Sequence, residues 1–178
     1  KTTRLLRIVA HPDSPIHFET TERVMVSVRG SRGNDVMIGP KYGGATFYGG
    51  EGDDLLRAIS VSESSRHFFY GGAGNDRLVG GGGRDVLDGG TGDDTIIGGN
   101  GADVLRGGDG LDFIDGQQGA DTAFLGADND FFRWDVGDGS DIVEGGSGFD
   151  GMLFNGNGGN EAFVAAANGG RLRFTRDI

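Results

Sequence analysis

The sequence predicts an all-β fold in which short parallel strands stack into a solenoid, and three observations support this. Residues 71–115 form five consecutive nine-residue units, GGAGNDRLV, GGGGRDVLD, GGTGDDTII, GGNGADVLR and GGDGLDFID. Each unit has Gly at its first, second and fourth positions, Asp at its sixth, and Leu or Ile at its eighth. No residue separates the units. Ungapped self-similarity of this kind indicates a repeat architecture in which each unit packs only against its neighbours.

The high glycine content could also indicate a disordered chain. Glycine accounts for 38 of the 178 residues, and glycine at that level usually indicates a flexible linker or a low-complexity segment. Here the glycines keep a strict register with Asp and with an apolar position. A linker has no need for such a register, so we favour an ordered repeat.

The charge balance narrows the class of partner. Asp and Glu number 27 against 16 Lys and Arg, a net charge of −11. This argues against nucleic acid, which requires a basic stripe, and favours a cation. There is no cysteine, and therefore neither a disulfide nor a thiolate metal site. No apolar run approaches the ~20 residues of a membrane span, and no signal peptide is visible at the start.

Each unit is expected to form one loop and one short strand, which is half of a coil. The strand period of two places the eighth residue on one face and its neighbours on the other. The inward residues of the array are then Leu78, Leu87, Ile96, Leu105 and Ile114. Units n and n+2 stack on the same side, which aligns their aspartates in two columns.

The segment before the array carries the pattern less regularly. We expect residues 1–29 to form an N-terminal strand cap, with strands near 4–10 and 22–28. The repeat region spans 30–153, beginning with an imperfect unit at 30–38 and a full one at 49–57. The stretches 39–48 and 58–70 are interpreted as half-turn insertions that have lost the Asp-bearing loop. Their aromatic residues are expected to widen the core.

After residue 115 the nine-residue repeat becomes less regular. Units 116–124 and 125–133 lack some of the glycines, and Trp134 and Asp135 are inserted before the register resumes. Phe131, Phe132 and Trp134 could form a binding patch, but a plug of the core is favoured. Residues 154–178 are expected to be a C-terminal cap, which we take as incomplete because the chain stops in the strand-like sequence RLRFTRDI.

The array resembles the calcium-binding nonapeptide of the RTX (haemolysin-type) family, GGxGxDxUx, in which U is a large apolar residue. The stretch DNDFFRWDVGDGSDIVEGGSGFD also resembles the end region of many bacterial RTX proteins. The resemblance implies a right-handed parallel β-roll with Ca²⁺ between stacked loops. One loop offers the carbonyls of its first and third residues, the next those of its second and fourth, and both offer their Asp. Glycine suits such loops because it adopts positive φ at low cost, and Ca²⁺ prefers carboxylate and carbonyl oxygens.

About five sites are expected within the array, and about nine at most along the chain. The five pair Asp76 with Asp94, Asp85 with Asp103, Asp94 with Asp112, Asp103 with Asp121 and Asp112 with Asp130. Asp35, Asp54, Asp141 and Asp150 extend the two columns. The backbone ligands implied by the resemblance are Gly71, Ala73, Gly80, Gly82, Gly89, Gly90, Thr91, Gly92, Gly98, Gly99, Asn100, Gly101, Gly107, Gly108, Asp109 and Gly110.

The expected function is that of a calcium-dependent structural and export-folding module of a secreted or surface protein. One apolar side chain per unit makes a small core, so we expect the array to fold only on binding Ca²⁺. The resemblance implies a Gram-negative bacterium and type I secretion machinery as a partner. Two alternatives stay open. The chain could be the C-terminal part of a secreted protease, lipase or epimerase, or an adhesin or surface-layer component that self-associates through Ca²⁺.

Catalysis by this chain itself is not expected. No HExxH or similar zinc spacing occurs, and almost every Asp is explained by the repeat. His11, His17 and His67, the only histidines, are expected in loops or on strand surfaces.

Overall fold

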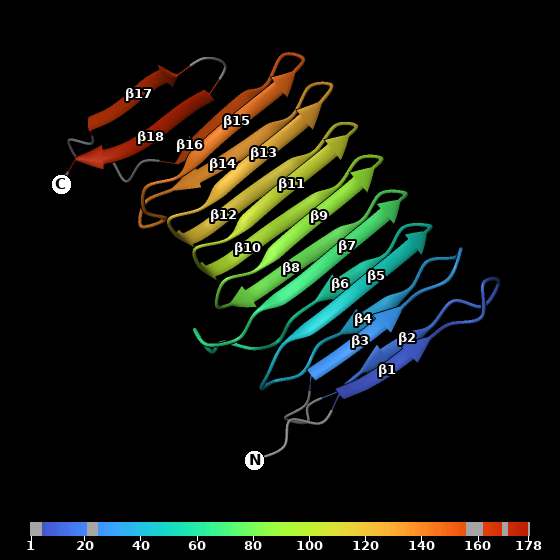
Figure 1. Cartoon of the computed structure of the whole chain (residues 1–178). Coiled ribbons are helices and arrows are strands. Elements are labelled where there is room, and N and C mark those ends of the chain that lie inside the picture. Colours follow the sequence, from blue (N-terminus) through green and yellow to red (C-terminus); the bar gives the residue numbers. More distant parts are fainter. Residues whose placement is uncertain (1–4, 21–24, 156–161, 169–170, 178) are drawn as a thin grey trace.

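The structure is a computed structural model that describes residues 5–20, 25–155, 162–168 and 171–177. These residues form eighteen strands and no helix, so the fold is all-β. Figure 1 shows the chain winding as a coil from the N-terminal strands to the C-terminal ones, with two sheets back to back. Among the described residues, no helix is long and apolar enough to cross a membrane.

Successive strands alternate between the two sheets, so that each coil contributes one strand to each. The ten-stranded sheet contains, in spatial order, β1 (Leu5–Val9), β3 (Met25–Arg29), β5 (Ala45–Glu51), β7 (His67–Ala73), β9 (Val86–Thr91), β11 (Val104–Asp109), β13 (Thr122–Ala127), β15 (Ile142–Ser147), β18 (Arg171–Asp177) and β17 (Ala162–Asn168). The eight-stranded sheet contains β16 (Gly151–Asn155), β14 (Phe131–Asp135), β12 (Phe113–Gly119), β10 (Thr95–Gly101), β8 (Arg77–Gly82), β6 (Leu55–Arg57), β4 (Val36–Ile38) and β2 (His17–Glu19).

Strand pairing confirms that nine residues make half a coil. Leu87 pairs with Leu105 between β9 and β11, and Ile96 pairs with Ile114 between β10 and β12, in both cases eighteen residues apart. Every neighbouring pair from β1 to β16 runs parallel. The parallel β-roll expected from the repeat is therefore the fold.

The core is a single file of side chains between the sheets. The five inward residues of the array, Leu78, Leu87, Ile96, Leu105 and Ile114, are all fully buried, as the alternation predicts. Towards the N-terminus the file becomes wider. Phe47 and Phe69 stack with ring centroids 4.9 Å apart, and Phe18 meets Phe47 edge-on at 6.1 Å. These aromatics widen the core as expected.

The two irregular stretches begin as loops and end as strands. Residues 39–44 and 58–66 connect the eight-stranded sheet to the ten-stranded one, and residues 45–48 and 67–70 are the first parts of β5 and β7. Neither loop contains an aspartate. The lengthened loops therefore lie on one side of the roll only.

The aromatic residues after the array confirm the plug in part. Phe132 and Trp134 are 1% and 2% exposed, on the inward face of β14. Phe131 is 57% exposed, so its expected place in the plug was wrong. Phe131 occupies the seventh position of its unit, and strand alternation turns that position outward.

Both ends of the chain continue the ten-stranded sheet. At the N-terminus β1 and β3 pair in parallel, in line with the coils that follow. At the C-terminus β18, in the sequence expected to form a closing strand, pairs antiparallel with β15 and with β17. The division of residues 1–29 and 154–178 into separate caps stays a prediction.

Candidate calcium-binding site

The loops between the sheets form two columns along the edges of the roll. The first column lies where odd-numbered strands pass to even-numbered ones, at the upper right of Figure 1, and the second lies on the opposite edge. The aspartates of the first column are Asp35, Asp54, Asp76, Asp94, Asp112, Asp130 and Asp150. Those of the second column are Asp85, Asp103, Asp121 and Asp141. The structure thus brings together every aspartate pair expected from the sequence.

One carboxylate oxygen of each aspartate links adjacent coils. The Oδ1 atom of Asp94 accepts a hydrogen bond from the backbone N–H of Asp76 at 2.7 Å, and Asp103 accepts one from Asp85 at 2.8 Å. Nine such links join the eleven aspartates, six in the first column and three in the second, at 2.7–3.2 Å. This arrangement orients the carboxylates identically in successive coils.

The other carboxylate oxygen is buried and has no hydrogen-bond partner. This holds for Oδ2 of Asp54, Asp76, Asp85, Asp94, Asp103, Asp112, Asp121, Asp130 and Asp141. These nine residues are at most 3% exposed. A buried polar atom without a partner costs about 1–3 kcal/mol, and more when charged, so native proteins contain few of them. Nine at the same position of a repeat indicate a site for a cation.

In seven of these nine loops the first residue is a glycine, which leaves room for that cation. A β-carbon on Gly80 would lie 2.7 Å from Oδ2 of Asp85 and 2.5 Å from the carbonyl oxygen of Gly98 in the next coil. On Gly98 it would lie 2.7 Å from Oδ2 of Asp103 and 2.8 Å from the carbonyl oxygen of Gly116. A carboxyl oxygen and a carbonyl oxygen therefore face the same point. A hard cation with oxygen ligands fits this cradle, which a β-carbon on the glycine would fill.

Burial raises the pKa of the nine aspartates whose Oδ2 has no partner. The pKa rises to about 8 for Asp85 and Asp121, to about 7 for Asp54, Asp94 and Asp141, and to about 6 for Asp76, Asp103 and Asp112. Loss of hydration is the largest cause, and the backbone hydrogen bond to Oδ1 opposes it. A bound cation would remove this penalty, because metal ligands must be deprotonated.

Side chains alone do not complete a metal site. Within the described residues, no three His, Asp or Glu side chains gather closely enough to hold an ion. Backbone carbonyls must therefore supply most of the ligands, which suits Ca²⁺ and not Zn²⁺. The third-position carbonyls of Ala73 and Thr91 each also accept a hydrogen bond, from Gly52 N–H at 2.7 Å and Gly74 N–H at 2.9 Å. A carbonyl oxygen has a second lone pair, so this does not prevent it from binding an ion.

Comparison with known families decides the assignment. The sequence model described as the RTX calcium-binding nonapeptide repeat matches four times, at residues 42–58, 70–105, 97–132 and 135–152, which together exceed half of the chain. The chain belongs to the RTX family. Its repeats are calcium-binding repeats and its β-roll is a structural domain. No curated protein matches the sequence.

The first column of this RTX roll carries a second set of links that the repeat pattern did not reveal. The fifth residues of its loops include Asn34, Asp53, Asn75, Asp93 and Asn129. The Oδ1 atom of each accepts the backbone N–H of the fifth residue in the next coil, at 2.7–2.9 Å. We call this series the Asx ladder. Leu111 interrupts the ladder, because its N–H donates to Asp93 but its side chain has no acceptor for Asn129.

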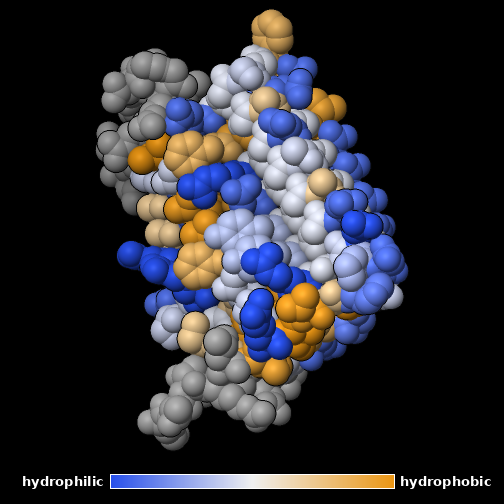
Figure 2. Space-filling model, turned by 45° about the vertical axis from the view of Figure 1, so that its right-hand side comes forward, coloured by the Kyte–Doolittle hydropathy of each residue, from blue (hydrophilic) through white to orange (hydrophobic). Residues whose placement is uncertain are grey.

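The Asx ladder lies on the outside of the first column. Its five members are exposed. Figure 2 turns this edge of the molecule forward and shows hydrophilic atoms along its right-hand side. The second column has Arg84, Ala102, Ala120 and Ser140 at the same position. The signal was present in the sequence as Asn or Asp at the fifth position of alternate units, but the family pattern leaves that position free.

The placement of His67 differs from the expectation. His11 and His17 are exposed as expected, but His67 is fully buried, so its expected surface position was wrong. The reason is its place in the coil. Its backbone N–H donates to Oδ1 of Asp85 at 2.7 Å, and its Nδ1 accepts the N–H of Ala45 at 3.1 Å. His67 therefore stands in the second column where an aspartate stands in later coils, and burial lowers its pKa to about 4.

The two ends of the first column also differ from its middle. Asp150 is exposed at the C-terminal end. At the N-terminal end Asp35 is buried, and Oδ2 accepts a hydrogen bond from the backbone N–H of Ser31 at 2.6 Å.

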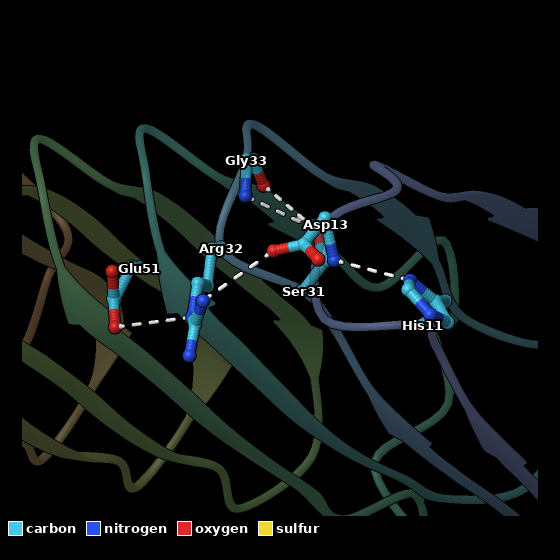
Figure 3. A network of polar contacts seen from close by, with 6 residues as sticks. All are labelled: His11, Asp13, Ser31, Arg32, Gly33 and Glu51. Carbon is cyan, nitrogen blue, oxygen red and sulfur yellow. Dashed lines mark hydrogen bonds and ion pairs between the residues drawn. The ribbon is translucent and has the colours of Figure 1, made fainter.

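Figure 3 shows the surface beside this end, where Arg32 forms ion pairs with Asp13 at 3.4 Å and with Glu51 at 3.8 Å. All three side chains are about two-thirds exposed, so these pairs contribute little stability.

Proposed function

We propose that this chain is a calcium-dependent structural domain that folds on binding Ca²⁺ outside the cell and supports the export and folding of a secreted or surface protein. The observation that carries the proposal is the set of nine buried Oδ2 atoms without hydrogen-bond partners, arranged in two columns. They are too costly to bury uncompensated, and the glycine cradles beside them suit Ca²⁺. The chain itself acts as a scaffold and not as a catalyst.

Folding and metal binding are coupled because the hydrophobic core of the array is too small to stabilise its fold alone. Each unit of residues 71–115 contributes one buried apolar side chain, and many of its positions are glycine, which loses the most conformational freedom on folding. Without a cation, stacked carboxylates repel one another. Asp76 and Asp112, on either side of Asp94, both raise its pKa. Calcium bound between the coils removes this repulsion and joins successive loops.

The calcium affinity expected of such sites indicates that the chain folds outside the cell. Extracellular calcium modules have dissociation constants of about 10⁻⁴–10⁻³ M, well above the calcium concentration of the cytosol. The chain would then stay unfolded during synthesis and passage through a narrow exporter, and fold on reaching external calcium. Similarity to RTX proteins points to type I secretion from a Gram-negative bacterium.

Circular dichroism of the whole chain in chelator and in millimolar Ca²⁺ tests the proposal. We expect little β-structure in chelator, a cooperative gain on adding Ca²⁺, and no comparable gain with Mg²⁺, which favours smaller octahedral sites. The same β-structure in chelator and in Ca²⁺ would contradict calcium-dependent folding. Light scattering during the titration separates folding of a monomer from calcium-dependent self-association.

A further inference from the structure

The N-terminal end of the first column is closed by hydrogen bonds. Asp35 is as buried as the other column aspartates, at 1% exposure, but its carboxylate receives donors on both oxygens. The backbone N–H of Ile16 donates to Oδ1 at 2.5 Å, and that of Ser31 donates to Oδ2 at 2.6 Å. The Ser31 hydroxyl also lies 3.1 Å from Oδ1. Asp35 is thus satisfied without a cation, unlike the nine aspartates after it.

Ser31 explains this difference. It occupies the second position of its unit, where the following loops have a glycine with positive φ, such as Gly50 at 127° and Gly72 at 121°. Ser31 is not among the residues with positive φ. A side chain disfavours that conformation, so the loop adopts another one in which the N–H points at Asp35.

The N-terminal end of the second column has neutral groups in place of a carboxylate, and the one buried atom there without a partner is Nε2 of His67. His67 replaces the aspartate and accepts the N–H of Ala45 as each Asp Oδ1 accepts one. The loop 58–66 beneath it has two buried serines, Ser60 and Ser65, whose hydroxyls lie 2.7 Å apart. Their carbonyls accept hydrogen bonds from Gly82 and Arg84 of the first complete loop. The second column therefore starts on a loop that carries no aspartate and no buried carboxylate, because its one acidic residue, Glu63, is exposed.

The core is also larger at this end. The strands β3, β5 and β7 each place two side chains inward, Val26 with Val28, Ala45 with Phe47 and His67 with Phe69, and all are at most 2% exposed. The array places one such side chain per unit. More apolar area is therefore buried per coil where the aspartate sites are closed.

We infer that the N-terminal coils, from β1 to the start of β7, fold without calcium and form the ordered edge on which the calcium-dependent coils assemble. The inference rests on the proposed function, because it divides the roll into a part that needs the cation and a part that does not. The first buried Oδ2 without a partner belongs to Asp54. The requirement for Ca²⁺ thus begins where the loop of Asp54 meets that of Asp76.

Hydrogen–deuterium exchange of the whole chain, followed peptide by peptide in chelator and in millimolar Ca²⁺, tests this division. In chelator we expect amides of β3, β5 and the first half of β7 to exchange on the order of tenfold or more slowly than those of β9 to β13. In Ca²⁺ both regions should be protected. Fast exchange everywhere in chelator, with protection everywhere in Ca²⁺, would overturn the inference and leave the proposed function standing. Protection everywhere in chelator would contradict the proposed function.

Two isosteric variants test the role of His67. Asparagine at this position offers a neutral acceptor for the Ala45 N–H, whereas aspartate adds a buried charge. We expect His67→Asn to keep the protection of β5 and β7 in chelator, and His67→Asp to lose most of it. Because both variants leave the same space beside Phe69, the comparison isolates charge from packing. Equal exchange in the two variants would overturn the assignment of His67 as a neutral replacement for a calcium-binding aspartate.

Discussion

At the scale of single residues, the nine column aspartates whose Oδ2 has no partner use their two oxygens differently. Oδ1 accepts a backbone hydrogen bond from the preceding coil, and in seven of the nine Oδ2 faces the glycine cradle of its own loop. An asparagine could keep the first role but not the charge of the second. This separation makes substitution of one aspartate a direct test of the calcium site.

Asp94→Asn should weaken calcium binding with little change in the unbound chain. Asp94 belongs to two links, with Asp76 before it and Asp112 after it, so two adjacent sites lose charge. We expect the calcium concentration at the midpoint of folding to rise on the order of tenfold, since affinity follows ligand charge. Calcium titration followed by circular dichroism measures it. Asp93→Asn, an exposed member of the Asx ladder in the same loop, is the matched control and should shift the midpoint much less.

The second position of the repeat provides a pair of opposite predictions. Gly108 has φ of 126°, and a β-carbon there would meet the carbonyl oxygen of Gly90, so Gly108→Ala should destabilise the calcium-bound roll by at least about 1–3 kcal/mol. Gln117 holds φ of 62° at the equivalent position, so Gln117→Gly should stabilise it by about 1 kcal/mol. Urea unfolding in saturating Ca²⁺ measures both. A stabilising Gly108→Ala would contradict the loop geometry.

Residue positions were predictable from the sequence where the repeat specifies both spacing and chemistry. The inward Leu87 and Ile96 and the aligned Asp76 and Asp94 follow from strand period and unit length alone. His67 was not predictable, because nothing in HFFYGG shows that a histidine occupies an aspartate position until the strands are placed in register. The hydrogen bonds to Asp35 depend on the conformation of Ser31, which a single departure from the pattern does not reveal.

At the scale of the elements, the two loop columns are unequal. The first has six aspartate links and the Asx ladder outside them, whereas the second has three aspartate links and no ladder among the described loops. The ladder joins adjacent coils without a cation, and the fifth positions that form it are exposed. Strand positions were predicted well, but this ladder was missed because it depends on which units become neighbours.

Repairing the gap in the Asx ladder should stabilise the roll. Leu111 is 55% exposed and interrupts the series between Asp93 and Asn129. Leu111→Asn would offer an acceptor to the Asn129 N–H, worth about 0.5–1.5 kcal/mol. Thermal unfolding in saturating Ca²⁺ should show the gain. Leu111→Ala removes the same exposed apolar side chain without adding an acceptor, and an equal gain from alanine would count against the ladder.

At the scale of the whole molecule, the raised carboxyl pKa values make the calcium-free roll sensitive to pH. An unfolded aspartate titrates near pH 3.8, whereas burial raises the pKa of eight column aspartates to between about 6 and 8. Between these values the folded state holds protons that the unfolded state has lost. Its stability is therefore present below about pH 4 and is lost as the pH rises through about 8.

Two opposite pH trends follow from this. In chelator, β-structure should be greatest near pH 4 and smallest near pH 8, as circular dichroism would show. In the presence of Ca²⁺, the cation must displace the protons, so the midpoint of the calcium titration should fall as the pH rises from about 6 to 8. Chelator-treated protein that gains β-structure as the pH rises would show that the column carboxylates do not control folding.

The alternation of strands between two sheets has a consequence for the length of the molecule. Both ends are tied to the ten-stranded sheet, β1 at one end and β18 against β15 at the other. Removal of one unit, residues 89–97, would move every later strand, β15 and β18 included, to the opposite sheet. The two ends would then no longer share a sheet, and the Asx ladder would be divided between the two columns. Removal of two units, residues 89–106, would restore both columns in a shorter roll. Thermal unfolding in saturating Ca²⁺ should show the second deletion to be the more stable, so insertions and deletions that preserve both ends and the ladder come in steps of eighteen residues.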